Sequence, residues 1–414
     1  MRKIISLVLC AMLTLSSVCL AACSSISGGY EGEVNVYNWG EYVSPGDEGR
    51  LDVIKEFEQR YNIKVNLTNY ETNEELYNIL VNSNSSYDVI FPSDYMVERL
   101  RSEGMLEEID FSNIPNYKNI DDRFKTGSYD PEGKYTVPYS WGFIALVYNT
   151  TMIGDNEIVG FSDLWNPEYA GGILMFNHSR DSMAIAMGQC DPPIDPGASS
   201  FSVEDIDRAT DKLVEQKLVL KKYVMDQVFT EMETSQSIIA PYYAGDIAVM
   251  MDNNEDLDYC LPEEGSNLFI DSMCIPTCCR NKENAELFIN FMCEAEIAAA
   301  NADYLYYGTP NKAAFELMDE DYQENELVNP SEEYMEKCYT FSNIDNDIYT
   351  YMQEKFVKAC SSTAEINELE TKTGNPVATA VVCVIIAVIV ILTIVIVILD
   401  IRKAVKNRGR INKI

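Results

Sequence analysis

The sequence predicts an α/β protein with two lobes, followed by one C-terminal transmembrane helix. From about residue 34 to residue 104, apolar strand-like segments alternate with amphipathic helical segments, which indicates a sheet with helices on both faces. The alternation starts again at 138–149, and the chain is long enough for a second lobe. Finally, 377–399 is an uncharged run of 23 mainly apolar residues, which is long enough to cross a bilayer.

Residues 1–22 are expected to be a signal peptide. A basic start precedes an apolar run at 4–20 that is short for a membrane span. Small residues then precede Cys23, and this layout resembles the lipobox of bacterial lipoproteins, in which the cysteine carries the lipid. We therefore expect lipidation at Cys23 rather than ordinary cleavage, followed by a short tether over 24–32.

The first lobe is expected to comprise 33–139 and 270–316, with a short strand ahead of Trp39. A helix over 47–61 would place Leu51, Ile54, Phe57 and Tyr61 on one face. The next expected elements are a strand at 63–67, a helix around 73–81, a buried strand at 87–92 and a helix over 95–104 capped by Gly104.

The second lobe is expected to comprise 140–269 and 317–360. A strand at 172–177 leads into a helix after Ser179, and Ser202 with Asp205 has the pattern of a capping box at a further helix. Later in the chain, the pattern predicts a strand at 269–276 and one long amphipathic helix at 281–302.

The C-terminal end combines a polar linker, 361–376, with the predicted span at 377–399. The span would be about 34 Å long as a helix, and the basic tail at 400–414 is expected to stay in the cytoplasm. An alternative is a degenerate sortase signal in the preceding "E-T-K-T-G-N-P", whose hydrophobic tail would be removed. Under either interpretation, the part between the two ends lies outside the cytoplasm.

Charge and cysteine usage exclude several classes of function. The chain has 66 acidic and 31 basic residues, for a net charge of −35, so nucleic acid is a poor partner and a small organic cation is a good one. Acidity could also serve solubility alone. The cysteine spacing is not that of a zinc site and the chain has one histidine, so neither a metal nor a cofactor is expected; the redox state of the eight ectodomain cysteines stays open.

Aromatic and acidic residues recur together at the ends of five predicted strands. Open α/β sheets bind ligands beyond the carboxyl ends of their strands, so these positions are the candidate site. The residues are Trp39, Glu41 and Tyr42 after the first strand, Ser93, Asp94 and Tyr95 after 87–92, Asp181 after 172–177, Tyr243 with Asp246, and Phe269 with Asp271.

Paired carboxylates also suggest a glycosidase, in which two acids face a sugar. No distinguishing spacing supports this, and the sequence has no G-x-S-x-G elbow, no H-E-x-x-H and no Gly-rich phosphate loop, so we expect no enzyme. A cation binder explains the pattern better, because carboxylates hold ammonium groups while aromatic faces cover the carbons between them. Several acids separated by aromatics suit a chain with two or three ammonium groups better than a metal ion, which prefers oxygens alone.

The residues also resemble a known family from about Val34 to about Asn311. The chain is similar to the spermidine/putrescine-binding lipoproteins of ABC importers, which have the two-lobed type II periplasmic-binding-protein fold with a ligand cleft between the lobes. The matching segments include "Y-N-W-G-E-Y-V", "Y-D-V-I-F-P-S-D-Y-M-V", "V-P-Y-S-W-G", "L-W-N-P-E-Y-A-G", "I-A-P-Y-Y-A-G-D", "F-I-D-S-M-C-I-P" and "Y-Y-G-T-P-N". The resemblance implies a polyamine ligand, and the permease and ATPase of a polyamine importer as partners.

The same resemblance implies roles for individual residues. Trp39, Glu41 and Tyr42 would form one wall of the groove, with contacts from Ser93 and Tyr95 and with Asp94 nearby. Asp181 would hold an amine from the second lobe, Asp271 would be the deepest amine ligand, and Tyr307 would close over it. Tyr243 and Phe269 stand where relatives can carry Trp.

Two departures from the family pattern leave the choice between spermidine and putrescine open. His178 stands where some spermidine binders have Asp, and we expect it to be a neutral hydrogen-bonding residue rather than a ligand. Asp246 stands where a small polar residue can occur, so it could restore an acid from another direction. The alternatives are a binder of another small cation on the same fold and an acidic adhesion module.

Overall fold

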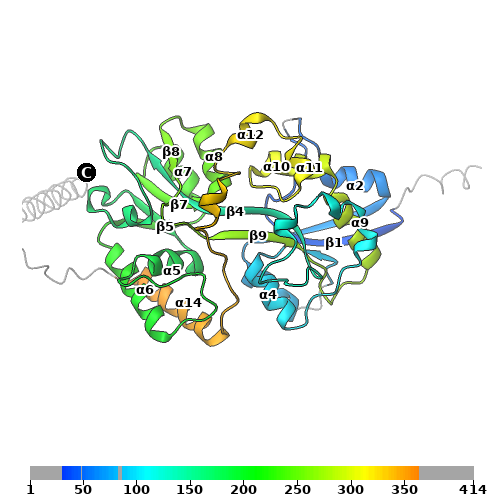
Figure 1. Cartoon of the computed structure of the whole chain (residues 1–414), viewed down its shortest axis with the longest axis horizontal. Helices are drawn as coiled ribbons and strands as arrows, with labels where there is room; N and C mark the ends of the chain where they lie inside the picture. Colours follow the sequence, from blue (N-terminus) through cyan, green and yellow to red (C-terminus); the bar gives the residue numbers. More distant parts are fainter. Residues whose placement is uncertain (1–29, 48, 83–85, 363–414) are drawn as a thin grey trace, which may run out of the picture. The chain divides into compact units, whose positions relative to one another are not determined.

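The structure is a computed structural model that describes residues 30–47, 49–82 and 86–362 (Figure 1). The described residues belong to one compact unit that ends at Ser362. The predicted signal peptide, the lipid site at Cys23, the linker, the span and the tail all lie outside the described residues. None of the described helices is long and apolar enough to cross a membrane.

The first sheet has the strand order β2-β1-β3 and is parallel. Its strands are β1 (Gly32–Trp39), β2 (Ile63–Tyr70) and β3 (Val89–Ile90). They alternate with helices α2 (Val53–Tyr61), α3 (Asn73–Asn82) and α4 (Asp94–Ser102). Val34 and Val36 of β1 are fully buried, and Val34 lies opposite Val65 of β2. The predicted alternation of strands and helices in this part is confirmed.

The second sheet has the order β6-β5-β7-β4-β8, and β9 pairs with β4 outside that path. Its strands are β4 (Val137–Asn149), β5 (Ile173–Phe176), β6 (Leu220–Val224), β7 (Ile239–Tyr243), β8 (Leu257–Cys260) and β9 (Leu268–Met273). β5 runs parallel to β6 and β7, whereas β4 is antiparallel to β7, β8 and β9.

Strands β4 and β9 link the two sheets (Figure 1). One half of β4 pairs with β9 and the other half pairs with β7 and β8. β9 and the residue after it continue toward the first sheet, where Asp271 bridges to Ser93 and Cys274 bridges to Ile90. The predicted lobe boundary at 139/140 therefore falls inside one continuous strand, and the division into lobes stays a prediction.

The remaining helices cover the sheets. They are α5 (Ser179–Gly188), α6 (Val203–Gln216), α7 (Gln227–Glu233), α8 (Ala244–Asn253), α9 (Lys282–Met292), α10 (Ala295–Leu305), α11 (Lys312–Phe315), α12 (Glu320–Glu324), α13 (Glu332–Met335) and α14 (Asn346–Ser361). Short 3-10 helices lie at Phe111–Asn113, Pro115–Asn119, Asp122–Phe124, Phe161–Trp165 and Pro167–Tyr169. α14 packs against α5 and α6 below β5 in Figure 1.

Helix boundaries agree with the sequence where a cap determines them. Ser202 accepts a hydrogen bond from the Asp205 N–H and Asp205 bonds back, which is the predicted capping box. Gly104 has a φ of +69° just beyond α4, as expected of a residue that ends a helix.

Two helix predictions were wrong. The predicted helix at 47–61 begins only at Val53, because Asp52 is its N-cap and accepts a hydrogen bond from the Lys55 N–H; Leu51 is therefore exposed. The predicted helix at 281–302 is two helices, because α9 ends at Met292 and Glu294 has the extended conformation that begins α10.

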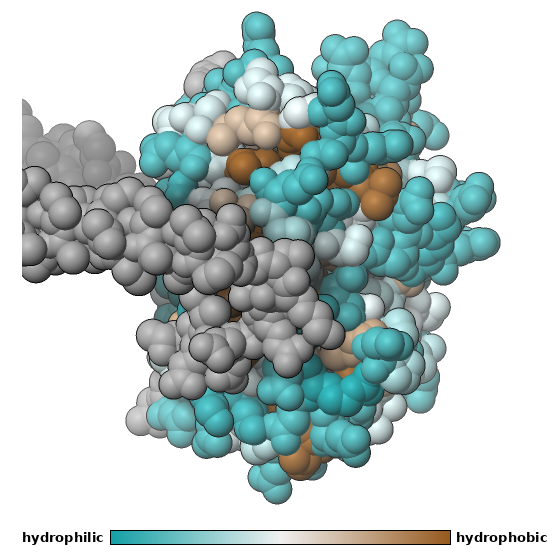
Figure 2. Space-filling view, turned by 90° about the vertical axis from the view of Figure 1, so that its left-hand side faces the viewer, coloured by the Kyte–Doolittle hydropathy of each residue, from teal (hydrophilic) through white to brown (hydrophobic). Residues whose placement is uncertain are grey.

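The described surface fits the acidic composition. Figure 2 shows a face on which hydrophilic residues predominate and apolar residues are scattered. Single apolar residues scattered over a surface are normal in folded proteins.

Candidate ligand-binding site

Asp271, one of the predicted ligands, is buried, with an exposed fraction of 4%. It lies in β9 and accepts hydrogen bonds from the Ser93 hydroxyl at 2.6 Å and the Tyr42 hydroxyl at 2.5 Å. Burial raises the pKa of Asp271 to about 6, although the two hydroxyl donors act in the opposite direction. Both partners are neutral, so nothing described compensates the charge of this carboxylate directly.

Asp246 lies in the first turn of α8, and the Tyr307 hydroxyl donates to its carboxylate at 2.9 Å. Burial raises the pKa of Asp246 to about 7, against the effect of the Tyr307 hydrogen bond. Asp246, which stands where the family pattern can have a small polar residue, therefore lies in direct contact with Tyr307.

Asp181 lies in the first turn of α5 and is 3% exposed. One oxygen of its carboxylate contacts two partners, the His178 Nδ1 at 2.8 Å and the Tyr243 hydroxyl at 3.0 Å. Burial lowers the pKa of His178, but the Asp181 and Glu74 carboxylates raise it, and the net effect is a pKa above the usual value. The neutral form of His178 stays a prediction, and the adjacent Asp181 carboxylate acts in favour of the charged form.

Four aromatic rings form a row that connects these carboxylates. The ring centroids of Tyr42 and Tyr307 are 6.5 Å apart, those of Tyr307 and Phe269 are 5.9 Å apart, and those of Phe269 and Tyr243 are 5.7 Å apart. We call Tyr42, Tyr307, Phe269 and Tyr243 the aromatic row. Each of its three tyrosines donates to a different aspartate, so acids and rings alternate along it.

Two glycines allow the row to pack closely. A Cβ atom on Gly142 would lie 2.7 Å from Phe269 and 2.8 Å from Tyr307. A Cβ atom on Gly245 would lie 2.7 Å from the Tyr306 carbonyl oxygen and 3.0 Å from Tyr307. Neither glycine is among the residues selected from the sequence, although Gly142 lies in the motif "V-P-Y-S-W-G" and Gly245 lies between the selected Tyr243 and Asp246.

The predicted wall after β1 consists of Trp39, Glu41 and Tyr42, and only Tyr42 belongs to the aromatic row. The Trp39 indole donates to the Phe91 carbonyl at 2.9 Å and packs against Tyr70 rather than against the row. Glu41 is exposed, with a φ of 50°, and within the described residues no hydrogen bond or ion pair joins it to the aspartates. Of the three residues, only Tyr42 contacts one of the buried carboxylates directly.

Asp94 and Tyr95 lie beside the site with different partners. Asp94 is 2% exposed, and one of its carboxylate oxygens has no hydrogen-bond partner among the described residues. Burial raises the pKa of Asp94 to about 8, which favours the protonated form in the absence of a cation. Tyr95 donates to Glu74 at 3.0 Å, and its ring lies 5.6 Å from the Arg180 guanidinium group.

Arg180 and Glu74 are residues that sequence reasoning missed. Arg180 is 3% exposed, donates to the Ser342 carbonyl at 2.7 Å, and lies 4.5 Å from the centroid of the Phe341 ring. Glu74 also accepts from the Tyr349 hydroxyl at 2.7 Å. A small cavity is lined by Glu74, Tyr95, Met96, Arg99, Arg180, Asn343, Ile344, Asn346 and Tyr349. No motif signalled these contacts, because the residues are distant in sequence.

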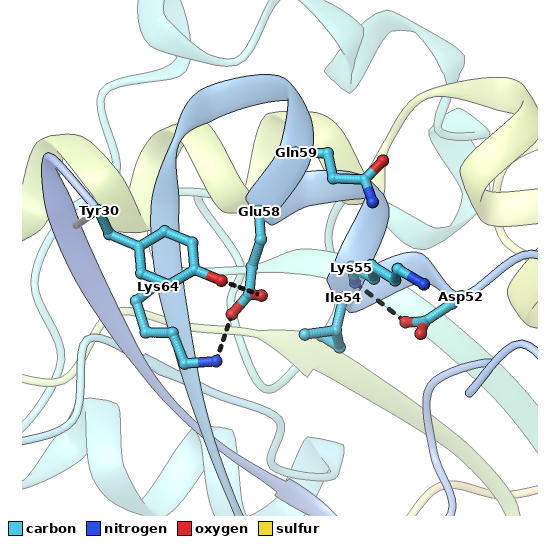
Figure 3. Close-up of a pocket in the computed structure, with 7 residues that line it drawn as sticks. All are labelled: Tyr30, Asp52, Ile54, Lys55, Glu58, Gln59 and Lys64. Carbon is cyan, nitrogen blue, oxygen red and sulfur yellow. Dashed lines mark hydrogen bonds and ion pairs between the residues drawn. The ribbon is translucent and has the colours of Figure 1, made fainter. Parts of the chain in front are cut away.

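A separate hollow on the surface lies around α2 and β2 (Figure 3). Glu58 accepts from the Tyr30 hydroxyl and from Lys64 there, each at 2.7 Å. The hollow contains none of the predicted site residues, and Glu58 and Lys64 form an ion pair within it. We therefore place the candidate site along the aromatic row.

The donor set of the site is suited to organic cations rather than to a metal. Across the described ranges, no group of three or more His, Cys, Asp or Glu residues could hold a metal ion. The three aspartates are instead separated by rings, so that ammonium groups could bind the acids while apolar carbons lie against the aromatic faces.

Comparison with known proteins agrees with this architecture. The sequence profile of the family described as bacterial extracellular solute-binding protein matches residues 52–330. The chain is 29% identical to the spermidine/putrescine-binding periplasmic protein of Escherichia coli over 298 residues, which cover 72% of this chain and 83% of that protein. It is 28% identical to the putrescine-binding periplasmic protein SpuD of Pseudomonas aeruginosa, with 78% and 91% covered.

Solved structures are similar over the same region. The spermidine/putrescine ABC transporter substrate-binding protein PotD of Streptococcus pneumoniae has a TM-score of 0.69 and 29% identity, covering 80% of this chain and 98% of that one. A structure from Listeria monocytogenes has a TM-score of 0.73 and 30% identity, with 79% and 98% covered. The profile match spans well over half of the chain, and the two-sheet fold with its linking strands accords with it. The chain belongs to the family of bacterial extracellular solute-binding proteins.

Proposed function

We propose that this protein binds a polyamine outside the cytoplasm and delivers it to the permease and ATPase of an ABC importer. The observation that carries the proposal is the alternation of Asp271, Asp246 and Asp181 with the aromatic row. Binding without chemical conversion of the ligand is the expected activity.

The physical argument begins with the cost of burying carboxylates. An ionised carboxylate in a poorly solvated site is destabilised unless a cation or several donors compensate it. The raised pKa values of Asp271 and Asp246 express this cost, because burial disfavours their charged forms. A ligand ammonium group would supply the missing positive charge, and the free energy gained would appear as affinity.

The rings account for the part of the ligand between its charges. Methylene groups flanked by ammonium groups are apolar, and aromatic faces can cover them while also attracting the neighbouring cations. A neutral sugar or a single amino acid would leave at least one buried aspartate without a cation. The names of the relatives from Escherichia coli and Pseudomonas aeruginosa support the same ligand class.

The proposed location places the binding unit on the outer face of the cell membrane. Lipid at Cys23 would anchor the N-terminal end, and the run at 377–399 would provide a membrane span with the basic tail in the cytoplasm. This arrangement would hold the binding unit near a membrane-embedded permease.

Calorimetric titration of the full chain in detergent tests the proposed ligand class. Putrescine and spermidine should bind, whereas a neutral sugar and a neutral amino acid should bind far more weakly. Asp155→Asn changes an exposed aspartate and serves as the control for loss of one acidic charge. Binding of the sugar with no heat from either polyamine would overturn the proposal.

A further inference from the structure

The three aspartates of the site differ in the charge of their partners. Asp271 accepts hydrogen bonds from two neutral hydroxyls, those of Ser93 and Tyr42, and Asp246 accepts from the neutral hydroxyl of Tyr307. Asp181 instead lies 2.8 Å from the imidazole of His178, a group that can carry a positive charge. Of the three acids, Asp181 therefore has a neighbouring side chain, His178, that can compete with a ligand ammonium group for its carboxylate.

The contact geometry makes this competition direct. The imidazole Nδ1 and the Tyr243 hydroxyl meet the same carboxylate oxygen of Asp181. The side chain of Asp181 is 4% exposed and that of His178 is 25% exposed, so the carboxylate has little water available as an alternative partner. When His178 is protonated, its N–H forms a charge-assisted hydrogen bond of the kind that a ligand ammonium would form.

We propose that His178 determines which polyamine this site accepts, because its imidazolium form takes at Asp181 the place of one ligand ammonium group. With His178 charged, the site offers two uncompensated acids, Asp271 and Asp246, and favours a diamine. With His178 neutral, Asp181 becomes available and the site also accommodates the third ammonium group of a triamine. This inference rests on the proposed polyamine-binding function.

The groups that face His178 come from two helices. Asp181 and Glu74 favour its charged form, whereas Arg180 opposes it; Arg180 and Asp181 lie on α5, and Glu74 lies on α3. Tyr243 and Tyr339 lie close to Asp181 and are affected by its charge. Burial lowers the pKa of His178, but the carboxylates of Asp181 and Glu74 raise it, and the net effect is a pKa above the usual value.

The expected pH dependence follows from the sign of that titration. As the pH rises through the pKa of His178, the imidazolium is lost and Asp181 is released to the ligand. The terminal amines of a polyamine resemble the lysine amine. Repulsion between neighbouring ammonium groups lowers the pKa of the central amine of a triamine, so the comparison is restricted to pH values below about 7.5, at which all the amines stay protonated. Titration of Asp271 and Asp246 affects diamine and triamine alike, and the affinity ratio of the two ligands therefore isolates His178.

Calorimetry at pH 6 and pH 7.5 with putrescine and spermidine measures this ratio for the full chain. The spermidine-to-putrescine affinity ratio should rise by about tenfold with pH in the wild type, the size expected for one hydrogen bond to a charged group. In His178→Asn, the ratio should be high at both pH values. Tyr243→Phe removes the other hydrogen bond to the same oxygen and should retain the pH dependence.

A second readout uses the fact that His178 is the only histidine of the chain. Labelled histidine gives one imidazole titration by NMR, so its pKa can be measured without assignment. By linkage, saturating spermidine should lower the pKa of His178, whereas putrescine should leave it unchanged.

The outcomes separate this inference from the function on which it rests. An identical pH profile in the wild type and His178→Asn, or a His178 pKa that spermidine does not move, would overturn the inference while polyamine binding stands. If neither polyamine binds the wild type at either pH, the proposed function fails and the inference fails with it. His178→Gln repeats the test if the asparagine variant does not fold.

Discussion

The Tyr42 hydroxyl lies 2.5 Å from the Asp271 carboxylate, although 229 positions separate the two residues in the chain. Tyr42 follows β1 of the first sheet, whereas Asp271 lies in β9, one of the two strands that link the sheets. The fold therefore assembles this part of the site from two regions that are far apart in sequence. The pair also defines the variants that test the site most directly.

Asp271→Asn should weaken polyamine binding strongly. The substitution keeps the size of the side chain and removes the charge, so a ligand ammonium would remain desolvated without its carboxylate. Truncating one partner of such a pair typically costs about 2–5 kcal/mol, roughly thirtyfold or more in affinity. Calorimetry measures the change, and thermal unfolding verifies that the variant is folded. Affinity equal to that of the wild type would show that the ligand binds elsewhere.

Glu41→Gln should weaken binding only slightly. Glu41 is exposed and has no described contact with the buried aspartates, so water solvates it before and after ligand binding. An exposed charge pair contributes about 0–1 kcal/mol, far less than a buried one. The same titration measures both variants. A loss as large as that of Asp271→Asn would mean that the loop after β1 encloses Glu41 when ligand binds.

Gly142→Ala should reduce both stability and affinity. The added Cβ atom would lie within 3 Å of Phe269 and Tyr307, so part of the aromatic row would have to move. Overpacking of this kind typically costs about 1–3 kcal/mol. Gly188→Ala is the matched control, because no atom lies within 4 Å of the position of its Cβ. Chemical denaturation and calorimetry should show the loss only in Gly142→Ala.

The titration of Asp246 and Asp271 should lower the free energy of unfolding of the ligand-free protein as the pH rises from about 4 toward 7. Burial raises the pKa values of these acids to about 7 and about 6, so in this window the folded state binds more protons than the unfolded state. The double variant Asp246→Asn/Asp271→Asn should flatten this part of the profile. Denaturant unfolding at several pH values measures the free energy of unfolding for both proteins; parallel profiles would contradict the prediction.

The predicted membrane topology can be tested with a tag placed after Ile414. If 377–399 spans the membrane, the tag should survive protease that is added to intact cells, because the basic tail lies in the cytoplasm. A mature protein that lacks the tag would favour removal of the tail by a sortase instead.

The sequence predicted most elements of the described region because their signals are local. The aromatic and acidic residues at strand ends can be recognised from a few neighbouring residues. The predicted capping box at Ser202 is likewise local, and it marks the start of α6. The predicted helix at 47–61 is too long because the prediction follows the apolar periodicity alone. The Asp52 side chain caps the first turn, so the helix begins at Val53. The helix at 281–302 was not divided because its apolar pattern continues across the break at Cys293 and Glu294.

Pairings within the site could not be predicted from local patterns. Asp246 and Tyr307 were both selected, but only the fold shows that one donates to the other. Arg180 was overlooked although it precedes Asp181, because its contacts with Tyr95 and Ser342 join segments that are far apart in sequence. The partners of a buried charge depend on the tertiary arrangement, which periodicity does not encode.

The pairing of β4 with β9 also has a mechanical consequence. The two strands connect the sheets and are hydrogen-bonded to each other, with an irregularity in register between Pro138 and Ser140. Any rotation of one sheet relative to the other must therefore bend β4 and β9 together. Strands bend most easily at a bulge. Ser140 lies opposite Asp271 just beyond the irregularity, and the Tyr139 hydroxyl donates to the Tyr42 carbonyl. The register irregularity and Asp271 are therefore neighbours, so that a ligand bound at Asp271 would lie beside the place where the two strands bend most easily.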